Sequence, residues 1–136
     1  MKRRILVLCS GNSARSQMAE GLLRHLGQGE LEVFSAGTAP STVHPLAIQV
    51  MDEIGVDITA QRSKHLDAYR DSAFDDVITV CDSAAESCPV FSGKARRTHW
   101  SLPDPAAVGG DEAIQVASFR RVRQALERHL GEWLRQ

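Results

Sequence analysis

The segment that decides the fold of this chain is ILVLCSGNSARS, residues 5–16. Its apolar start is typical of a buried strand, and residues 17–25 continue as a helical pattern. The small polar residues between them form a strand-to-helix turn, where several backbone N–H groups lack intrahelical partners and point toward one place. We therefore expect an anion site at this turn, with the thiol of Cys9 at its floor.

Outward from this segment, short apolar runs alternate with helical patterns. Strands are expected at residues 4–8, 31–35, 76–80 and 97–100. Helices are expected at residues 14–26, 44–54 and 111–134. This alternation favours parallel pairing through right-handed crossovers. The sequence thus predicts an α/β fold, an open four-stranded parallel sheet flanked by helices, in a single domain over residues 1–136.

The helical periodicity also predicts which side chains face the core. In residues 14–26 they are Met18, Leu22 and either His25 or Leu26. In residues 111–134 they are Ile114, Val116, Phe119, Val122, Leu126, Leu130 and Trp133. Both helices should therefore pack through one apolar stripe.

The composition is that of an ordinary globular protein, with 43% hydrophobic and 24% charged residues among 136. A net charge of -1 gives no reason to expect a nucleic acid or a membrane as partner, and no secretion signal or membrane span is expected. Three cysteines, an odd number, suit a reducing compartment better than a disulfide scaffold. We expect a cytoplasmic protein, and we expect it to be a monomer.

The turn has the spacing Cys-x5-Arg-Ser, which combines a thiol with a guanidinium that can hold two oxygens of a tetrahedral oxyanion. Cys9 is the expected nucleophile and Arg15 the expected oxyanion ligand. The helix N-terminus and the hydroxyls of Ser13 and Ser16 should favour the thiolate form of Cys9. The oxyanion-binding residues are expected to be Ser10, Gly11, Asn12, Ser13, Ala14, Arg15 and Ser16.

Cys81 and Asp104 also follow predicted strands, so they should reach the same edge of the sheet as Cys9. The Cys-x5-Arg-Ser loop and the pair Asp104-Pro105 resemble the low-molecular-weight protein tyrosine phosphatase superfamily. The resemblance extends to QMAEG (17–21), SAGT (35–38) and FRRVR (119–123). It implies that Asp104 is a general acid that protonates the leaving oxygen as Cys9 attacks, a role that contributes about 10²–10⁴-fold.

The two remaining cysteines resemble those of the thioredoxin-coupled arsenate reductases in this superfamily. Cys81 ends a predicted strand, and Cys88 follows seven residues later across a Ser/Ala-rich segment. The resemblance implies arsenate as substrate, with phosphate or sulfate as analogues, and thioredoxin as partner in arsenic detoxification. In the implied relay, Cys81 attacks the adduct of Cys9 with arsenic, and Cys88 captures Cys81 in a disulfide that thioredoxin reduces. Three thiols can supply the two electrons that arsenate reduction needs, whereas a phosphatase needs one thiol.

Other interpretations stay open. Phosphatases of this fold usually have aromatic residues after Asp-Pro, where this chain has Ala106 and Ala107, so a small oxyanion suits the site better than a phosphotyrosine. A phosphatase remains the alternative, followed by an oxyanion-binding regulator without turnover. Cys81 and Cys88 could instead be core residues, and a zinc site lacks ligand spacing. Glutaredoxin or a low-molecular-weight thiol could replace thioredoxin.

Some thioredoxin-coupled relatives bind potassium beside the catalytic loop. At the matching positions this chain has Arg62 and Lys64 in place of a threonine and an aspartate, which disfavours a bound cation. The ammonium of Lys64 could reach Glu20 in its place. The residues expected to support the loop are Asn12, Ser16, Glu20, Ser35 and Lys64. No metal and no other cofactor are expected.

Overall fold

The computed structural model describes residues 2–82 and 95–136. Its elements are β1 (Arg3–Cys9), α1 (Arg15–Gly27), β2 (Leu31–Gly37), α2 (Pro45–Asp52), the 3-10 turn η1 (Leu66–Tyr69), β3 (Asp76–Thr79), β4 (Arg96–His99), the 3-10 turn η2 (Pro105–Ala107) and α4 (Glu112–Leu134). Within these residues, four strands pair in parallel in the order β2-β1-β3-β4. The prediction of an α/β fold with an open four-stranded parallel sheet is confirmed.

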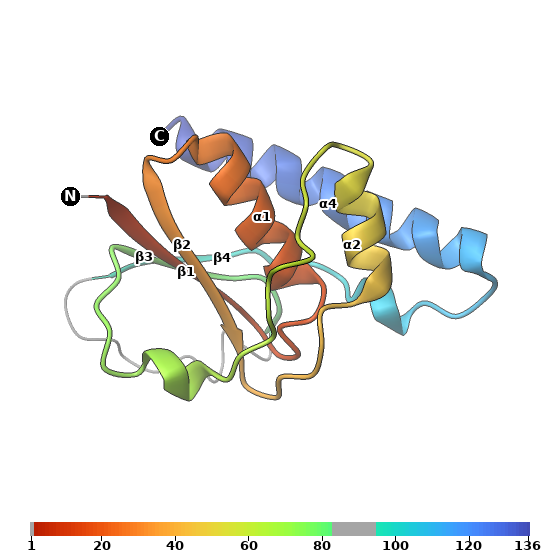
Figure 1. Cartoon of the computed structure of the whole chain (residues 1–136), viewed down its shortest axis with the longest axis horizontal. Helices are drawn as coiled ribbons and strands as arrows, with labels where there is room; N and C mark the ends of the chain where they lie inside the picture. The colour runs from red at the N-terminus through yellow and green to blue at the C-terminus, as the bar shows by residue number, and fades with distance from the viewer. Residues whose placement is uncertain (1, 83–94) are drawn as a thin grey trace.

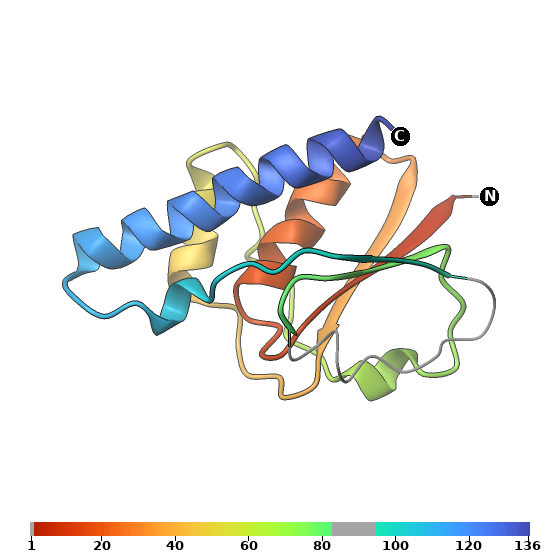
Figure 2. The same cartoon turned by 180° about the vertical axis from the view of Figure 1, so that it is seen from behind.

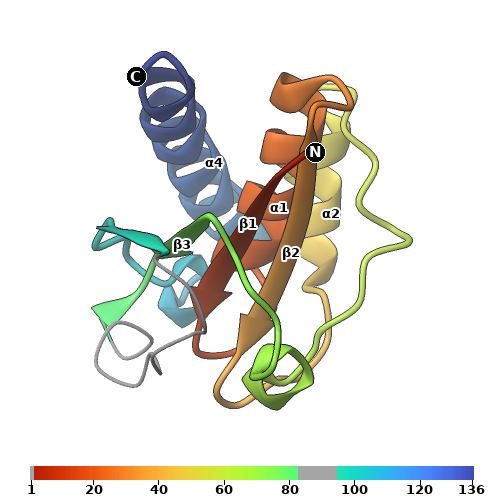
Figure 3. The same cartoon turned by 90° about the vertical axis from the view of Figure 1, so that its left-hand side faces the viewer.

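The helices α1, α2 and α4 lie together on one side of the sheet, and η1 lies on the other side (Figures 1 and 2). The view in Figure 3 places β1 between β2 and β3, as the strand order requires. Both chain ends lie at the end of the molecule where β1 begins (Figures 1 and 2). None of the described helices is long and apolar enough to cross a membrane.

β1 is a central strand, paired with β2 on one edge and with β3 on the other. Its last five residues are all buried, as expected for a parallel strand covered on both faces. The register places Cys9 beside Gly37 at the end of β2. Cys9, the last residue of β1, therefore lies at the carboxyl edge of the sheet, where ligands bind in open α/β folds.

The predicted core faces are wrong at two places. His25 and Leu26 are exposed, and Leu23 occupies the core on that turn of α1. Ile114 is 49% exposed because the first turns of α4 extend past α2 (Figure 1), where Ile114 lies over Gly110. The turns η1 and η2 were not predicted, because 3-10 segments of three or four residues are too short to show a periodicity.

α4 packs on both α1 and α2, and two arginines fasten it to the end of α2. Arg123 is buried and donates to the Val50 carbonyl at 2.7 Å and to Glu53 at 2.8 Å. Arg120 donates to the same carboxylate at 2.6 Å. Hydrogen bonds from Arg120 and then Arg123 lower the pKa of Glu53 to about 2. The carboxylate form of Glu53 therefore joins the last helix to the rest of the fold.

Candidate active site

The loop between β1 and α1 turns its carbonyl groups outward. The carbonyl oxygens of Ser10, Gly11 and Ser13 accept hydrogen bonds from the N–H groups of residues 39, 41 and 44, at 2.8, 3.2 and 3.0 Å. The Asn12 carbonyl accepts from the side-chain amide of Gln17 at 3.0 Å. Because peptide N–H and C=O groups point in opposite directions, most N–H groups of the loop face its interior. No side chain caps α1 at Ala14, so the N–H groups of its first turn are also open to an anion.

Asn12 organises the loop. It is fully buried in the left-handed conformation, at φ 45°, which asparagine tolerates better than most residues. Its Nδ2 donates to Ser16 Oγ at 2.8 Å and to Ser35 Oγ at 2.9 Å. Its Oδ1 accepts from the backbone N–H of Lys64 at 2.8 Å. The start of α1, the strand β2 and the segment before η1 are thereby attached to one side chain.

The bonds of Asn12 fix the direction of the hydroxyl protons on either side of it. Ser16 Oγ accepts from Asn12 and lies 2.9 Å from Cys9 Sγ, so its proton is available to the sulfur. Ser35 Oγ accepts from Asn12 and donates to Glu20 Oε1 at 2.5 Å. The network thus runs from the buried side chain of Glu20 to the sulfur, and it places the Ser16 hydroxyl as a hydrogen-bond donor to Cys9.

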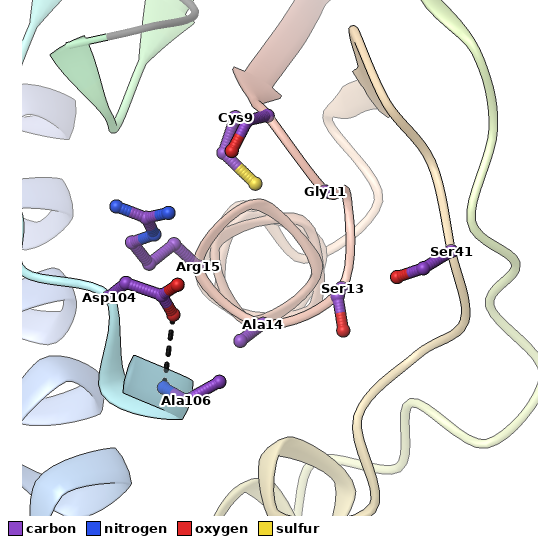
Figure 4. Close-up of a pocket in the computed structure, with 9 residues that line it drawn as sticks. Cys9, Gly11, Ser13, Ala14, Arg15, Ser41, Asp104 and Ala106 are labelled. Atoms are coloured by element: carbon purple, nitrogen blue, oxygen red, sulfur yellow. Dashed lines mark hydrogen bonds between the residues drawn. The ribbon is translucent and has the colours of Figure 1, made fainter. Parts of the chain in front are cut away.

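A cavity of about 220 Å³ opens above Cys9 (Figure 4). It is lined by Cys9, Ser10, Gly11, Ser13, Ala14, Arg15, Ser41, Asp104 and Ala106. Five of the seven predicted oxyanion-binding residues after Cys9 therefore line it. The other two, Asn12 and Ser16, lie behind the loop as supports.

Arg15 and Asp104 share one side of this cavity (Figure 4). Arg15 is 9% exposed, and its Nη1 donates to the Leu102 carbonyl at 3.0 Å, which ties the oxyanion loop to the segment that carries Asp104. Asp104 caps η2 by accepting from the Ala106 N–H at 3.0 Å. The structure thus brings together a thiol, a guanidinium and a carboxyl group, the set needed for nucleophilic attack on an oxyanion and protonation of a leaving oxygen.

Cys81 lies against the same loop. It is buried two residues after β3, and its Sγ accepts a hydrogen bond from the Ser10 N–H at 3.2 Å. Ser10, an expected oxyanion-binding residue, therefore lines the cavity while its N–H donates to Cys81. Cys9 and Cys81 are both buried. Cys88 lies outside the described residues.

Lys64 lies at the far side of the network. Its Nζ is 3.9 Å from Glu20 Oε1 and donates to the Arg62 carbonyl, while Arg24 Nη1 is 2.7 Å from Glu20 Oε2. Burial is the main cause that lowers the pKa of Lys64; Arg24 and Arg62 act in the same direction and Glu20 opposes them. Among the described residues, no group of His, Cys, Asp or Glu side chains could hold a metal ion.

Several residues that support the site were not predicted from the sequence. Ser41 lines the cavity, and Gln17 is a fully buried amide that donates to Asn12 and Arg62. Gln61 donates in turn to Gln17 at 2.8 Å. The only signal for Gln17 was its place in QMAEG, and Ser41 and Gln61 had none, because their roles depend on long-range packing.

The chain is similar to known proteins over nearly its whole length. The family model described as low molecular weight phosphotyrosine protein phosphatase matches residues 4–136. An arsenate reductase of Bacillus licheniformis is 43% identical over 126 residues, which is 92% of this chain and 90% of that protein.

Solved structures agree with this match. An arsenate reductase in the phosphate binding state aligns with a TM-score of 0.78 at 32% identity, covering 96% of this chain and 95% of that one. A thioredoxin-dependent arsenate reductase of Corynebacterium glutamicum aligns with a TM-score of 0.72 at 30% identity. That alignment covers 99% of this chain and 64% of the other.

Proposed function

Because the chain belongs to the low molecular weight phosphotyrosine protein phosphatase family, and similar members are arsenate reductases, we propose that it reduces arsenate to arsenite. The observation that carries the proposal is the second thiol. Cys81 Sγ accepts from the N–H of Ser10, the residue next to Cys9. Hydrolysis of a phosphate ester uses one thiol and gives Cys81 no role, whereas a two-electron reduction requires a second sulfur.

The reaction begins with attack of the Cys9 thiolate on arsenate held by Arg15 and the loop N–H groups. An arsenic–oxygen bond breaks as a sulfur–arsenic bond forms, and Asp104 protonates the departing oxygen, which leaves as water. The Cys81 thiolate then attacks the sulfur of Cys9. The sulfur–arsenic bond breaks with its electron pair on arsenic, so arsenic(V) becomes arsenic(III) and leaves as arsenite.

The disulfide left between Cys9 and Cys81 is resolved by the third cysteine. Cys88 attacks Cys81, and Cys9 returns to its thiolate form. Two thiols have been oxidised for each arsenate reduced, so the electrons balance. We propose that a thioredoxin dithiol reduces the Cys81–Cys88 disulfide; the similarity to a thioredoxin-dependent arsenate reductase of Corynebacterium glutamicum supports this choice of reductant.

The lining of the cavity supports a small oxyanion rather than a phosphotyrosine. Ala106 follows Asp104-Pro105 on the cavity wall and offers no ring to stack on an aromatic substrate. Two aromatic side chains that could have formed such a clamp pack against other rings. The ring centroids of Phe74 and Phe34 are 5.7 Å apart, and those of Trp100 and His129 are 4.9 Å apart. Phe91, a further candidate, lies outside the described residues.

We further propose that Lys64 takes the place of a potassium ion behind the loop. Glu20 is 2% exposed and already has two cations beside it, Arg24 and Lys64. A potassium ion added here would bring a third positive charge to one buried carboxylate, which Coulomb repulsion disfavours. Lys64 also braces the loop through its backbone N–H, which donates to Asn12.

The test is a pair of assays on one preparation. Arsenate-dependent oxidation of NADPH, coupled through thioredoxin and its reductase, is measured beside hydrolysis of an aryl phosphate. Cys9→Ser should abolish both activities, whereas Cys81→Ser should abolish the first and spare the second. Equal loss of both activities in Cys81→Ser would contradict the three-cysteine relay. Aryl phosphate hydrolysis without arsenate turnover in the unmodified protein would favour the phosphatase alternative.

A further inference from the structure

Asp82, the residue after Cys81, is attached to β4 and to the residues that follow it. Its Oδ1 accepts from His99 Nε2 at 2.9 Å, and its Oδ2 accepts from Ser101 Oγ at 3.3 Å. His99 is also the register partner of Thr79 on β3, and its Nδ1 lies 2.7 Å from Thr79 Oγ1. One imidazole therefore bridges Thr79 and Asp82, the residues on either side of the pair Val80-Cys81. We call Thr79, Asp82, His99 and Ser101 the Asp82 clasp.

The donors and acceptors of the clasp are matched in both charge states of the imidazole. An ionised carboxylate only accepts, so Nε2 carries the proton toward Asp82 whether the ring is neutral or charged. The Thr79 hydroxyl can donate to Nδ1 in the neutral ring or accept from it in the charged ring. The hydrogen bond from His99, followed by that from Ser101, lowers the pKa of Asp82, with a smaller contribution from the charge of Arg15. Both ring nitrogens of His99 therefore have a hydrogen-bond partner in either charge state.

The clasp fixes the position of a thiol that has to face the Cys9 loop. On one side of Cys81, Val80 N–H donates to the Leu8 carbonyl at 3.0 Å, which holds the chain to β1. On the other side, Asp82 holds it to β4. The sulfur between these two attachments meets the Ser10 N–H at 3.2 Å. We propose that Asp82 and His99 are positioning residues that hold Cys81 for its attack on Cys9, an inference that rests on the proposed function.

If Asp82 and His99 position Cys81, their loss should affect arsenate reduction but not aryl phosphate hydrolysis. Aryl phosphate hydrolysis uses Cys9, Arg15 and Asp104. Their hydrogen bonds go to Ser16, Leu102 and Ala106 and to no clasp residue, and Arg15 acts on Asp82 through its charge alone. Arsenate reduction also needs Cys81 at the loop. Asp82→Ala should therefore lower arsenate turnover by roughly fivefold, the scale of an exposed ion pair, and leave aryl phosphate hydrolysis unchanged. Asp82→Asn should restore most of the loss, since its amide oxygen still accepts from His99.

Asp67→Ala is the matched control. Asp67 is an exposed carboxylate in η1 beside a histidine, with its Oδ2 3.4 Å from His65 Nδ1, and it also accepts from Arg70. Its side chain is 60% exposed, against 72% for Asp82. This control should retain both activities. If Asp82→Ala loses both activities, or neither, the proposed positioning of Cys81 is wrong. It is also wrong if Asp82→Asn fails to restore arsenate turnover.

A second measurement needs no arsenate. In the Cys88→Ser background, the rate at which iodoacetamide alkylates Cys81 is followed by peptide mass spectrometry. Added Asp82→Ala should raise that rate severalfold, because release of the clasp exposes a buried thiol, whereas added Asp67→Ala should not. An unchanged rate in Asp82→Ala would overturn the clasp. If the unmodified protein fails to reduce arsenate, the proposed function fails, and the alkylation rate still decides whether the clasp holds Cys81.

Discussion

Substitution of Gly37 by alanine should displace the loop between β1 and α1 through direct contact with its backbone. Gly37 ends β2 beside Cys9. A Cβ atom there would lie 2.5 Å from the Ser10 carbonyl oxygen, 2.7 Å from the Cys9 carbonyl oxygen and 2.9 Å from the Asn12 nitrogen. All three atoms belong to the backbone of the loop, so no side-chain rotation can relieve the contact.

The size of the effect follows from these distances. Ordinary contact with a Cβ begins at 3.4 Å, so the Ser10 carbonyl has to move away by about 0.9 Å, from 2.5 to 3.4 Å. A misplacement of about 1 Å in a catalytic array can cost about 10²-fold in rate. Overpacking at a buried site typically costs about 1–3 kcal/mol of stability. We therefore expect Gly37→Ala to fold with lower stability and to lose about 10²-fold in kcat/KM for both substrates.

The assay is kcat/KM for aryl phosphate hydrolysis and for arsenate reduction, at a temperature where urea unfolding shows the variant to be folded. Gly131→Ala makes the same chemical change in α4, where an added Cβ meets nothing within 4 Å. It should keep full activity and gain about 0.5–1 kcal/mol, the helix preference of alanine over glycine. Gly37→Ala with activity within about threefold of the unmodified protein would refute the reasoning, since the loop would then tolerate the displacement.

Three further outcomes are expected. Exchange of KCl for NaCl at fixed ionic strength should leave steady-state rates unchanged, and Lys64→Ala should lower arsenate turnover; severalfold activation by potassium would show that the ion still binds. Asp104→Asn should lower turnover by about 10²-fold without loss of folding, and unchanged turnover would eliminate Asp104 as the acid. The pKa of Glu53 is lowered from 4.5 to about 2, so its stabilising contribution is complete above pH 4.5 and is lost as the pH falls toward 2. The urea midpoint should therefore fall more steeply over this range in the unmodified protein than in Glu53→Gln, and parallel curves would contradict the assignment.

The sequence was informative where one local pattern determines both structure and chemistry. The run from Ile5 to Leu8 indicated a buried strand, and the small polar residues after it indicated a turn; the strand is confirmed as the buried end of β1. The conformation of that turn was not predictable in the same way. It depends on Asn12 at positive φ and on acceptors for its side chain that come from Ser16 and Ser35.

The contacts that the sequence did not predict join residues far apart in the chain. Arg15 and Leu102 are 87 positions apart, and Gln61 and Gln17 are 44 apart. His99 and Asp82 belong to segments that meet only because β4 pairs with β3. Long-range hydrogen bonds of this kind leave no periodic pattern in the sequence. They can be identified only once the fold is known.

The order in which the parts of the loop occur along the chain has a consequence for synthesis on the ribosome. The carbonyl groups of the loop and the side chain of Asn12 have their partners within the first 64 residues. A nascent chain of that length can already pair β1 with β2, but the other edge of β1 stays open until residues 76–79 emerge. Docking of β3 closes this edge, and the same event brings Cys81 to Ser10. The loop after β1 is thus synthesised first, Cys81 follows with the strand that closes the sheet, and Asp104 comes last.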